Sequence, residues 1–190
     1  MATKFDSITA NGLKIFNPDA LYVTPFVSET EKAATGYKLT EVIRDTTSIS
    51  QDDPEEQTIE NEFGSAPILN NTTLGSYKFS AEVADMQPTL LEKLCGYKKG
   101  TTQTDCVFAP SSYTPIYAEI ALVFKISETK SVAAILPKVQ LNSKATFDSL
   151  SSNMGRITLS GTGLNFTMTD GDVTFETPFY VDTNFSISEL

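Results

Sequence analysis

Side chains that commonly catalyse reactions are scarce in this chain of 190 residues, which contains no His and only two Cys. Without His, the chain cannot build a Ser-His-Asp triad or use His-based acid–base catalysis, and nearly all zinc sites are excluded. Cys95 and Cys106 could form a disulfide in an oxidising compartment or remain free thiols in a reducing cytosol. The sequence leaves both states open.

Two short motifs match ligand-binding loops only in part. Asp170, Gly171 and Asp172 match a fragment of a calcium loop, but the spaced acids and the closing Glu of such a loop are missing. Gly161 and Gly163 lack the third Gly and the following helix of a dinucleotide-binding fingerprint. We therefore expect a turn at the first motif, and we expect no metal ion, no cofactor and no enzymatic activity.

A cluster of acidic residues lies in one stretch that contains no basic residue. Carboxylate pairs catalyse glycoside hydrolysis only at fixed separations within a cleft, which a polar loop does not supply. The cluster is therefore interpreted either as a solvated acidic loop or as an acidic surface kept for a partner or for the lumen of an assembly. Its members are Asp52, Asp53, Glu55, Glu56, Glu60 and Glu62.

The composition indicates one globular domain spanning residues 1–190. A chain of this size buries roughly 70% of its unfolded surface, and its 40% hydrophobic and 20% charged residues are typical of a folded protein. With 24 acidic and 14 basic residues the net charge is −10, so the chain is not expected to wrap DNA. Its apolar runs are far shorter than the ~20 residues of a membrane span, and the N-terminus lacks the apolar segment of a secretory signal. We expect a soluble protein with no membrane insertion.

The elements that must position these residues are mainly β-strands, because apolar residues recur at every second position. In residues 116–127, this alternation runs without a break from Ile116 to Ile126. Pro137 predicts an edge position or a bulge in its strand, and Gly161 with Gly163 predicts a bend. The short connection at 127–130 predicts an antiparallel pair. The expected strands are 21–27, 37–44, 76–83, 116–127, 132–145, 156–168 and 173–179.

One helix is predicted at residues 86–95. Asp85 is placed to cap its first turn, and Pro88 suits that turn because the missing N–H costs little there. Leu90, Leu91 and Leu94 form one apolar stripe, and Gly96 ends the helix in the left-handed conformation. Leu90 and Leu94 are expected to be buried against a sheet.

Residues 45–73 differ from the rest of the chain because they are polar and contain few large apolar side chains. A segment this long without its own core is usually functional or disordered. One interpretation pairs residues 46–50 with residues 58–63 as a hairpin around Asp52 and Asp53. The other is an extension whose anchors, Ile49, Ile59 and Phe63, contact a neighbouring subunit.

The run from Gly75 to Gly96, GSYKFSAEVADMQPTLLEKLCG, resembles the major tail tube proteins of bacteriophages. In that family an alternating strand leads directly into the single helix. The acidic stretch before it, which ends at residues 63–67, resembles the long loop of the family, and the long antiparallel strands that follow fit as well. The resemblance covers the pattern of residues 20–180.

The resemblance implies a fold class that is mainly β: two antiparallel sheets as a sandwich or small barrel, with one flanking α-helix, a long extended loop at 45–73 and an N-terminal arm at 1–19. It implies a structural virion protein. Six copies would form a ring, and rings stacked through the loop and the terminal arms would form a conduit for DNA. The implied partners are other copies of the chain, the tape-measure and tail terminator proteins, and DNA passing through without sequence-specific contacts. The implied location is the virion tail, assembled in the bacterial host cytoplasm.

Other functions stay open on the sequence. The same fold builds the inner tube of contractile injection systems, so a phage origin does not follow from the resemblance. A β-sandwich binding module or adhesin is the alternative of a different class. A calcium-ligand cluster or a signal peptide would favour that alternative, and a tube in electron micrographs would contradict it.

Overall fold

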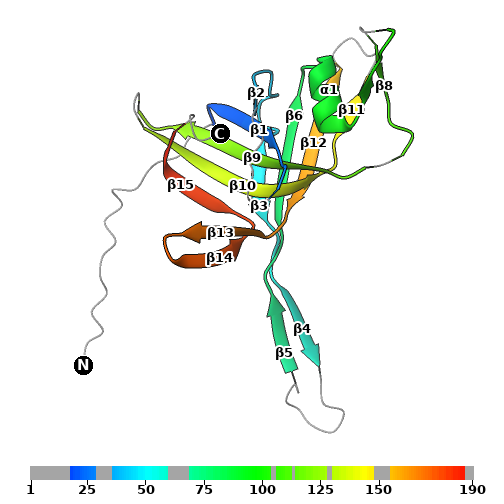
Figure 1. Cartoon of the computed structure of the whole chain (residues 1–190). Coiled ribbons are helices and arrows are strands. Elements are labelled where there is room, and N and C mark those ends of the chain that lie inside the picture. Colours follow the sequence, from blue (N-terminus) through cyan, green and yellow to red (C-terminus); the bar gives the residue numbers. More distant parts are fainter. Residues whose placement is uncertain are drawn as a thin grey trace, which may run out of the picture.

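The computed structural model describes residues 18–28, 36–59, 69–103, 106–112, 114–127, 130–147 and 155–186. The protein is mainly β, built from antiparallel sheets, and the described residues contain one helix (Figure 1). This confirms the predicted fold class, apart from the small barrel. The barrel is wrong because the large sheet stays open: its end strands each pair on one side only within the described residues.

The large sheet has nine strands, most of them in one continuous order, and three two-stranded sheets accompany it. The order along the main path is β2 (Tyr37–Leu39), β1 (Ala20–Pro25), β9 (Ile116–Lys125), β10 (Ser131–Leu141), β12 (Arg156–Gly163), β6 (Tyr77–Val83) and β3 (Ser48–Gln51). Outside this path, β11 (Lys144–Thr146) pairs with β12, and β15 (Tyr180–Phe185) pairs with β10. The small sheets pair β4 (Glu55–Ile59) with β5 (Leu69–Thr73), β7 (Lys98–Lys99) with β8 (Val107–Phe108), and β13 (Phe166–Asp170) with β14 (Val173–Thr177).

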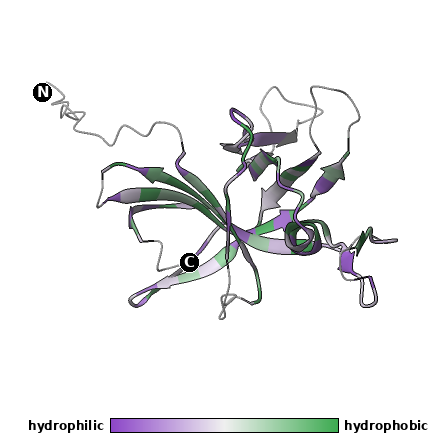
Figure 2. Cartoon of the chain, turned by 90° about the horizontal axis from the view of Figure 1, so that it is seen from above, coloured by the Kyte–Doolittle hydropathy of each residue, from purple (hydrophilic) through white to green (hydrophobic). Residues whose placement is uncertain are grey.

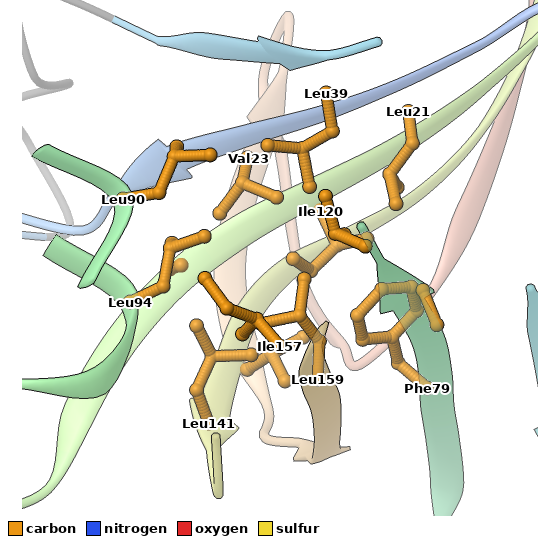
Figure 3. Close-up of a cluster of buried hydrophobic side chains, with 14 of the residues drawn as sticks. Leu21, Val23, Leu39, Phe79, Leu90, Leu94, Ile120, Leu141, Ile157 and Leu159 are labelled. Atoms are coloured by element: carbon orange, nitrogen blue, oxygen red, sulfur yellow. The ribbon is translucent and has the colours of Figure 1, made fainter. Parts of the chain in front are cut away.

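The main core is formed where the large sheet coils, so that strands from its two halves face one cluster of side chains. Figure 3 shows Leu21 and Val23 of β1 in the same cluster as Phe79 of β6, although three strands separate β1 from β6 in the sheet. The long strands are mainly hydrophobic, whereas their connections are more hydrophilic (Figure 2). A second cluster on the opposite face includes Ala121 and Val123, so β9 is buried on both faces along part of its length.

The large sheet forks at Pro137. Strand β15 pairs with β10 over residues 131–135, and β12 pairs with the same edge over residues 139–141. The pairing of β10 with β9 shifts register between Leu136 and Val139, which confirms the predicted bulge. Because Pro has no N–H, it interrupts the ladder where the two partner strands separate. The predicted bend in residues 156–168 follows Gly163, beyond which the chain leaves the sheet as the β13–β14 hairpin.

The helix α1 (Pro88–Cys95) begins two residues later than predicted, and Asp85 does not cap it. Gln87 is the capping residue, and it makes no side-chain cap. Asp85 Oδ1 instead accepts a hydrogen bond from the Gln87 N–H at 3.0 Å. Pro88 explains the shift, because a proline keeps the preceding residue extended. Gly96 ends the helix in the left-handed conformation, as predicted.

The apolar stripe of the helix is buried as predicted. Leu90, Leu91 and Leu94 all belong to the main core cluster. Strands β9 and β10 form an antiparallel pair, which confirms the predicted pairing. The predicted strand at 132–145 is broken after Leu141, so that its last residues form β11 beside β12.

Candidate assembly surfaces

Strands β4 and β5 form a hairpin that extends away from the rest of the molecule, and we call these two strands the arm (Figure 1). Within the described residues, β4 pairs only with β5. The predicted pairing of residues 46–50 with 58–63 is therefore wrong: β3 pairs with β6, and β4 pairs with residues 69–73. Burial explains the choice of partner, since Ile49 of β3 lies opposite the buried Phe79 of β6.

The arm continues the large sheet in unbroken register. Gln51 pairs with Tyr77 at the end of the sheet, and Glu55 pairs with Thr73 at the start of the arm. Between these two pairs both strands advance by the same number of residues, so no residue is inserted on either side. Pro54 lies in this interval and cannot donate to a ladder. The arm is therefore the outer half of one long hairpin, with an interruption at its base.

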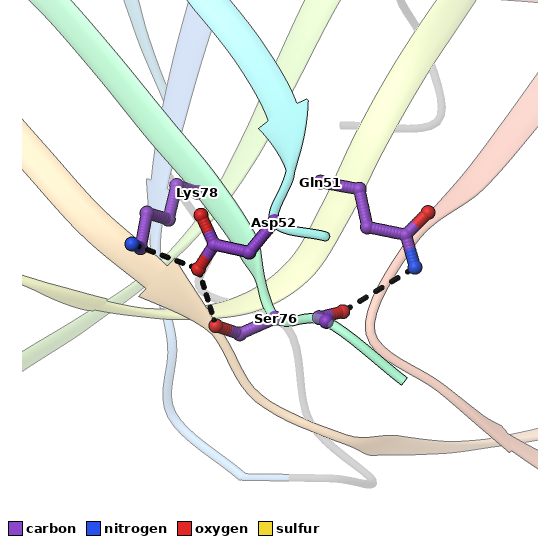
Figure 4. A network of polar contacts seen from close by, with 5 residues as sticks. Gln51, Asp52, Ser76 and Lys78 are labelled. Atoms are coloured by element: carbon purple, nitrogen blue, oxygen red, sulfur yellow. Dashed lines mark hydrogen bonds and ion pairs between the residues drawn. The ribbon is translucent and has the colours of Figure 1, made fainter. Parts of the chain in front are cut away.

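Side-chain and backbone contacts hold the base of the arm together (Figure 4). Lys78 Nζ lies 2.8 Å from Asp52 Oδ2, and Ser76 Oγ donates to the same oxygen at 3.0 Å. The Asp52 N–H donates to the Ser76 carbonyl at 2.9 Å. Gln51 Nε2 donates to the Gly75 carbonyl at 3.3 Å. The hydrogen bond from Lys78, followed by that from Ser76, lowers the pKa of Asp52. Asp52 is thus an acceptor favoured in its ionised form, and it links β3 to β6 where the arm leaves the sheet.

Gly75 allows the two chain segments to approach each other at this base. A Cβ at this position would overlap the carbonyl oxygen of Asp52 and lie 2.8 Å from that of Asp53. Only a residue without a side chain fits here. The base is therefore fixed sterically by Gly75 as well as electrostatically by Asp52.

The predicted acidic residues fall into two groups within the described part of the arm region. Asp52 is engaged at the base, whereas Asp53, Glu55 and Glu56 are exposed beyond it. The described side chains of β5 are exposed as well, so the arm has no core of its own. Glu60 and Glu62 lie outside the described residues.

The three predicted assembly anchors are not gathered in one place. Ile49 packs against the main core of its own chain, partly buried. The backbone of Ile59 pairs with that of Leu69 in the arm, but its side chain lies outside the described part. Phe63 also lies outside the described residues. Contact with a neighbouring subunit through these anchors stays a prediction.

Several strand edges in the described residues have no partner strand. β2 pairs only with β1, β3 only with β6, and β15 only with β10. Such edges present unpaired backbone donors and acceptors, which favour the addition of a further strand. The sequence pattern does not reveal these edges, because strand order depends on contacts between distant segments.

The remaining chemistry of the described residues is limited. Cys95 and Cys106 are free thiols, and burial raises the pKa of Cys95 to about 11. An open cavity of about 460 Å³ is lined by residues of β1, by residues 39–47 and by Leu122, and its lining includes both the apolar Leu21 and the charged Arg44. Across the described ranges, no three acidic or Cys side chains form a group able to hold a metal ion. The one helix in those ranges, α1, lacks the length and hydrophobicity needed to span a bilayer.

Comparison with known proteins leaves the family open. No protein-family model matches the chain, and no curated protein matches it either.

Proposed function

We propose that this chain is a structural subunit that assembles into a hollow tube, as the major tail tube protein of a bacteriophage does. The observation that carries the proposal is the arm: a projecting, exposed hairpin that is fixed firmly to a β body with open strand edges. An isolated two-stranded hairpin is at best marginally stable in water. In this proposal a neighbouring copy covers the arm and stabilises it.

Open edges supply the second contact that such an assembly needs. If strands of neighbouring copies add to each other's edges, the contact is repeated around an axis and closes a ring. The resemblance in the run from Gly75 to Gly96 suggests six copies in that ring. Stacking of rings through the arms would then extend the ring into a tube.

The net charge of −10 suits the inside of such a tube. DNA carries a dense row of phosphates, and a wall with an excess of carboxylates repels it. DNA could then pass without adhering, while the tape-measure protein occupies the lumen before it. In this proposal the tube belongs to a virion tail, and a tail terminator protein caps its end.

Negative-stain electron microscopy of the purified full-length chain tests the proposal, together with a variant in which Asn-Gly replaces residues 54–74. Because Asp53 and Gly75 are neighbours at the base, a two-residue turn can join them and keep the β3–β6 pairing. We expect the unmodified chain to form rings or tubes, and the variant to fold but not to form tubes.

Two outcomes would contradict the proposal. A chain that stays monomeric in sedimentation at high concentration does not build a tube and would favour a binding module. A variant that still forms normal tubes would show that the arm has no part in stacking. Circular dichroism of the variant checks that its β body is intact.

A further inference from the structure

The β13–β14 hairpin has one apolar face that is covered only at its root. Phe166 and Thr177 are cross-strand partners at the root, where the Phe166 ring packs edge-on against Phe26 with centroids 6.1 Å apart. Further out on the same face, Val173 and Phe175 are 63% and 42% exposed. The face therefore continues beyond the part that the chain itself covers.

Two acidic residues lie at the uncovered end of this face. Asp170 is the cross-strand partner of Val173, so their side chains lie on the same side of the hairpin. Asp172 follows in the turn, after Gly171 with its positive φ of 59°. The sequence contains no Lys or Arg after Arg156. The tip of this hairpin is thus an apolar surface with an acidic border.

The β7–β8 pair carries the opposite combination. Lys98 and Phe108 are cross-strand partners and therefore share a face. Phe108 is 52% exposed, and both Lys98 and Lys99 are exposed. Unlike Lys78, Lys93 and Arg156, neither Lys98 nor Lys99 takes part in an ion pair within the described residues.

These two surfaces lie on opposite sides of the molecule, β13–β14 near the arm and β8 beside α1 (Figure 1). They cannot meet within one chain. We propose that the β13–β14 tip of one copy binds the β7–β8 surface of a second copy, with Asp170 and Asp172 facing Lys98, with Lys99 on the other face of the pair adding positive charge nearby, and with Val173 and Phe175 packing near Phe108. The occupant of each surface is another copy of this chain.

Such a contact is heterologous, because two different surfaces of one chain meet. A heterologous contact repeats from copy to copy and produces either a closed ring or an open stack. Each surface is small, so the contact adds to others rather than holding two copies alone. The inference rests on the proposed function in requiring that copies of the chain assemble, but it adds a contact that does not involve the arm.

Charge reversal tests the contact with the full-length chain. One variant carries Asp170→Lys and Asp172→Lys, and the other carries Lys98→Glu and Lys99→Glu. We expect each to weaken self-association by about tenfold or more in sedimentation velocity, because like charges then face each other. An equal mixture of the two variants restores association, because every contact between unlike variants again joins opposite charges.

A control separates this contact from one made by the arm. The variant Glu55→Lys with Glu56→Lys reverses two exposed arm acids. The proposed contact is unchanged in this variant, so we expect it to associate by itself. If it instead loses association and regains it when mixed with Lys98→Glu/Lys99→Glu, the lysines face the arm and the inference is wrong. Phe175→Ser is a second variant that leaves all charges in place, and we expect it to weaken association too.

The remaining outcomes are also decisive. If both charge-reversal variants associate like the unmodified chain, or if their mixture fails to recover, this contact does not exist, whereas the proposed function survives as long as tubes form. If the unmodified chain never associates, both the contact and the proposed function fail. Circular dichroism of each variant confirms that it has folded.

Discussion

Gly75 at the base of the arm shows how a single residue can fix the direction of a whole element. A methyl group there would overlap the carbonyl oxygen of Asp52. We expect Gly75→Ala to destabilise the protein by about 1–3 kcal/mol, the usual cost of overpacking. Gly155→Ala is the matched control, because its Cβ would lie 3.5 Å from Met86 Cγ, an ordinary contact. Urea unfolding of both variants checks this, and equal losses would contradict the steric explanation.

Asp52 makes the base of the arm sensitive to acid. Hydrogen bonds from Lys78 and then Ser76 lower its pKa in the folded state. A lowered pKa means that the carboxylate stabilises the fold above its unfolded pKa of about 3.9, and that this stabilisation is lost as the pH falls through the folded pKa. We expect Asp52→Asn to be less stable than the unmodified chain at neutral pH, with a gap that narrows in acid. Urea unfolding across that range measures the gap, and a gap that widens in acid would contradict the assignment.

The two thiols differ in their surroundings, which gives a third prediction at this scale. Cys106 is exposed, whereas Cys95 is half-buried and burial raises its pKa to about 11. The thiolate is the reactive form, and little of it exists on Cys95 at a pH of about 8. We expect a disulfide reagent to label Cys106 quickly and Cys95 only slowly or after unfolding. Cys95→Ser and Cys106→Ser assign the two rates, and fast labelling of the Cys106→Ser variant would contradict this.

Among the elements, the helix depends on its apolar stripe more than on its cap. Leu94 is 1% exposed and belongs to the main core. We expect Leu94→Ala to cost about 2–5 kcal/mol through lost burial and a cavity. The neighbouring Lys93→Ala serves as a control, because that side chain is exposed. Thermal or urea unfolding measures both, and a loss below about half a kcal/mol at Leu94 would show that the stripe does not carry the packing.

Strands with a strong apolar alternation could be predicted from the sequence, and polar ones could not. Residues 116–127 were predicted as a strand because one face is apolar throughout, and β9 occupies most of that segment. Residues 46–50 have a single large apolar side chain, so their partner could not be read from a pattern. Contact between Ile49 and the core decides which strand these residues pair with. The late start of the helix follows from Pro88, whose effect on the preceding residue outweighs the capping preference of Asp85.

The candidate contact surfaces could be predicted from the sequence even less than the polar strands, because they depend on contacts between segments that are distant in the sequence. The acidic cluster is visible in the sequence, but the engagement of Asp52 requires Lys78, which reaches it only through the β3–β6 pairing. The same holds for the β13–β14 hairpin. The alternation of apolar residues in this segment predicts a strand. Which part of the apolar face of the hairpin is covered depends on Phe26, which lies far away in the sequence.

At the scale of the whole molecule, a well-packed body is joined to an arm that has almost nothing to pack against. The body is held by core side chains from both halves of the coiled sheet. The described side chains of the arm are exposed, and its strands pair only with each other. Stability within one chain is therefore uneven, as is common where a segment is reserved for a partner.

Hydrogen exchange can measure the difference in stability between the body and the arm, and whether that difference depends on assembly. In the free monomer, ordering the arm costs about 1–2 kcal/mol per residue in backbone entropy, with little burial to offset it. We expect amides of β4 and β5 to exchange rapidly in the monomer, while those of β9 and β10 are protected. If the chain forms the proposed tube, contacts with a neighbouring copy would offset the cost, and we expect the amides of the arm to become protected as well. Protection of the arm that is the same in monomer and tube would show that its order does not depend on a neighbour, and would remove the physical reason for giving it a role in stacking.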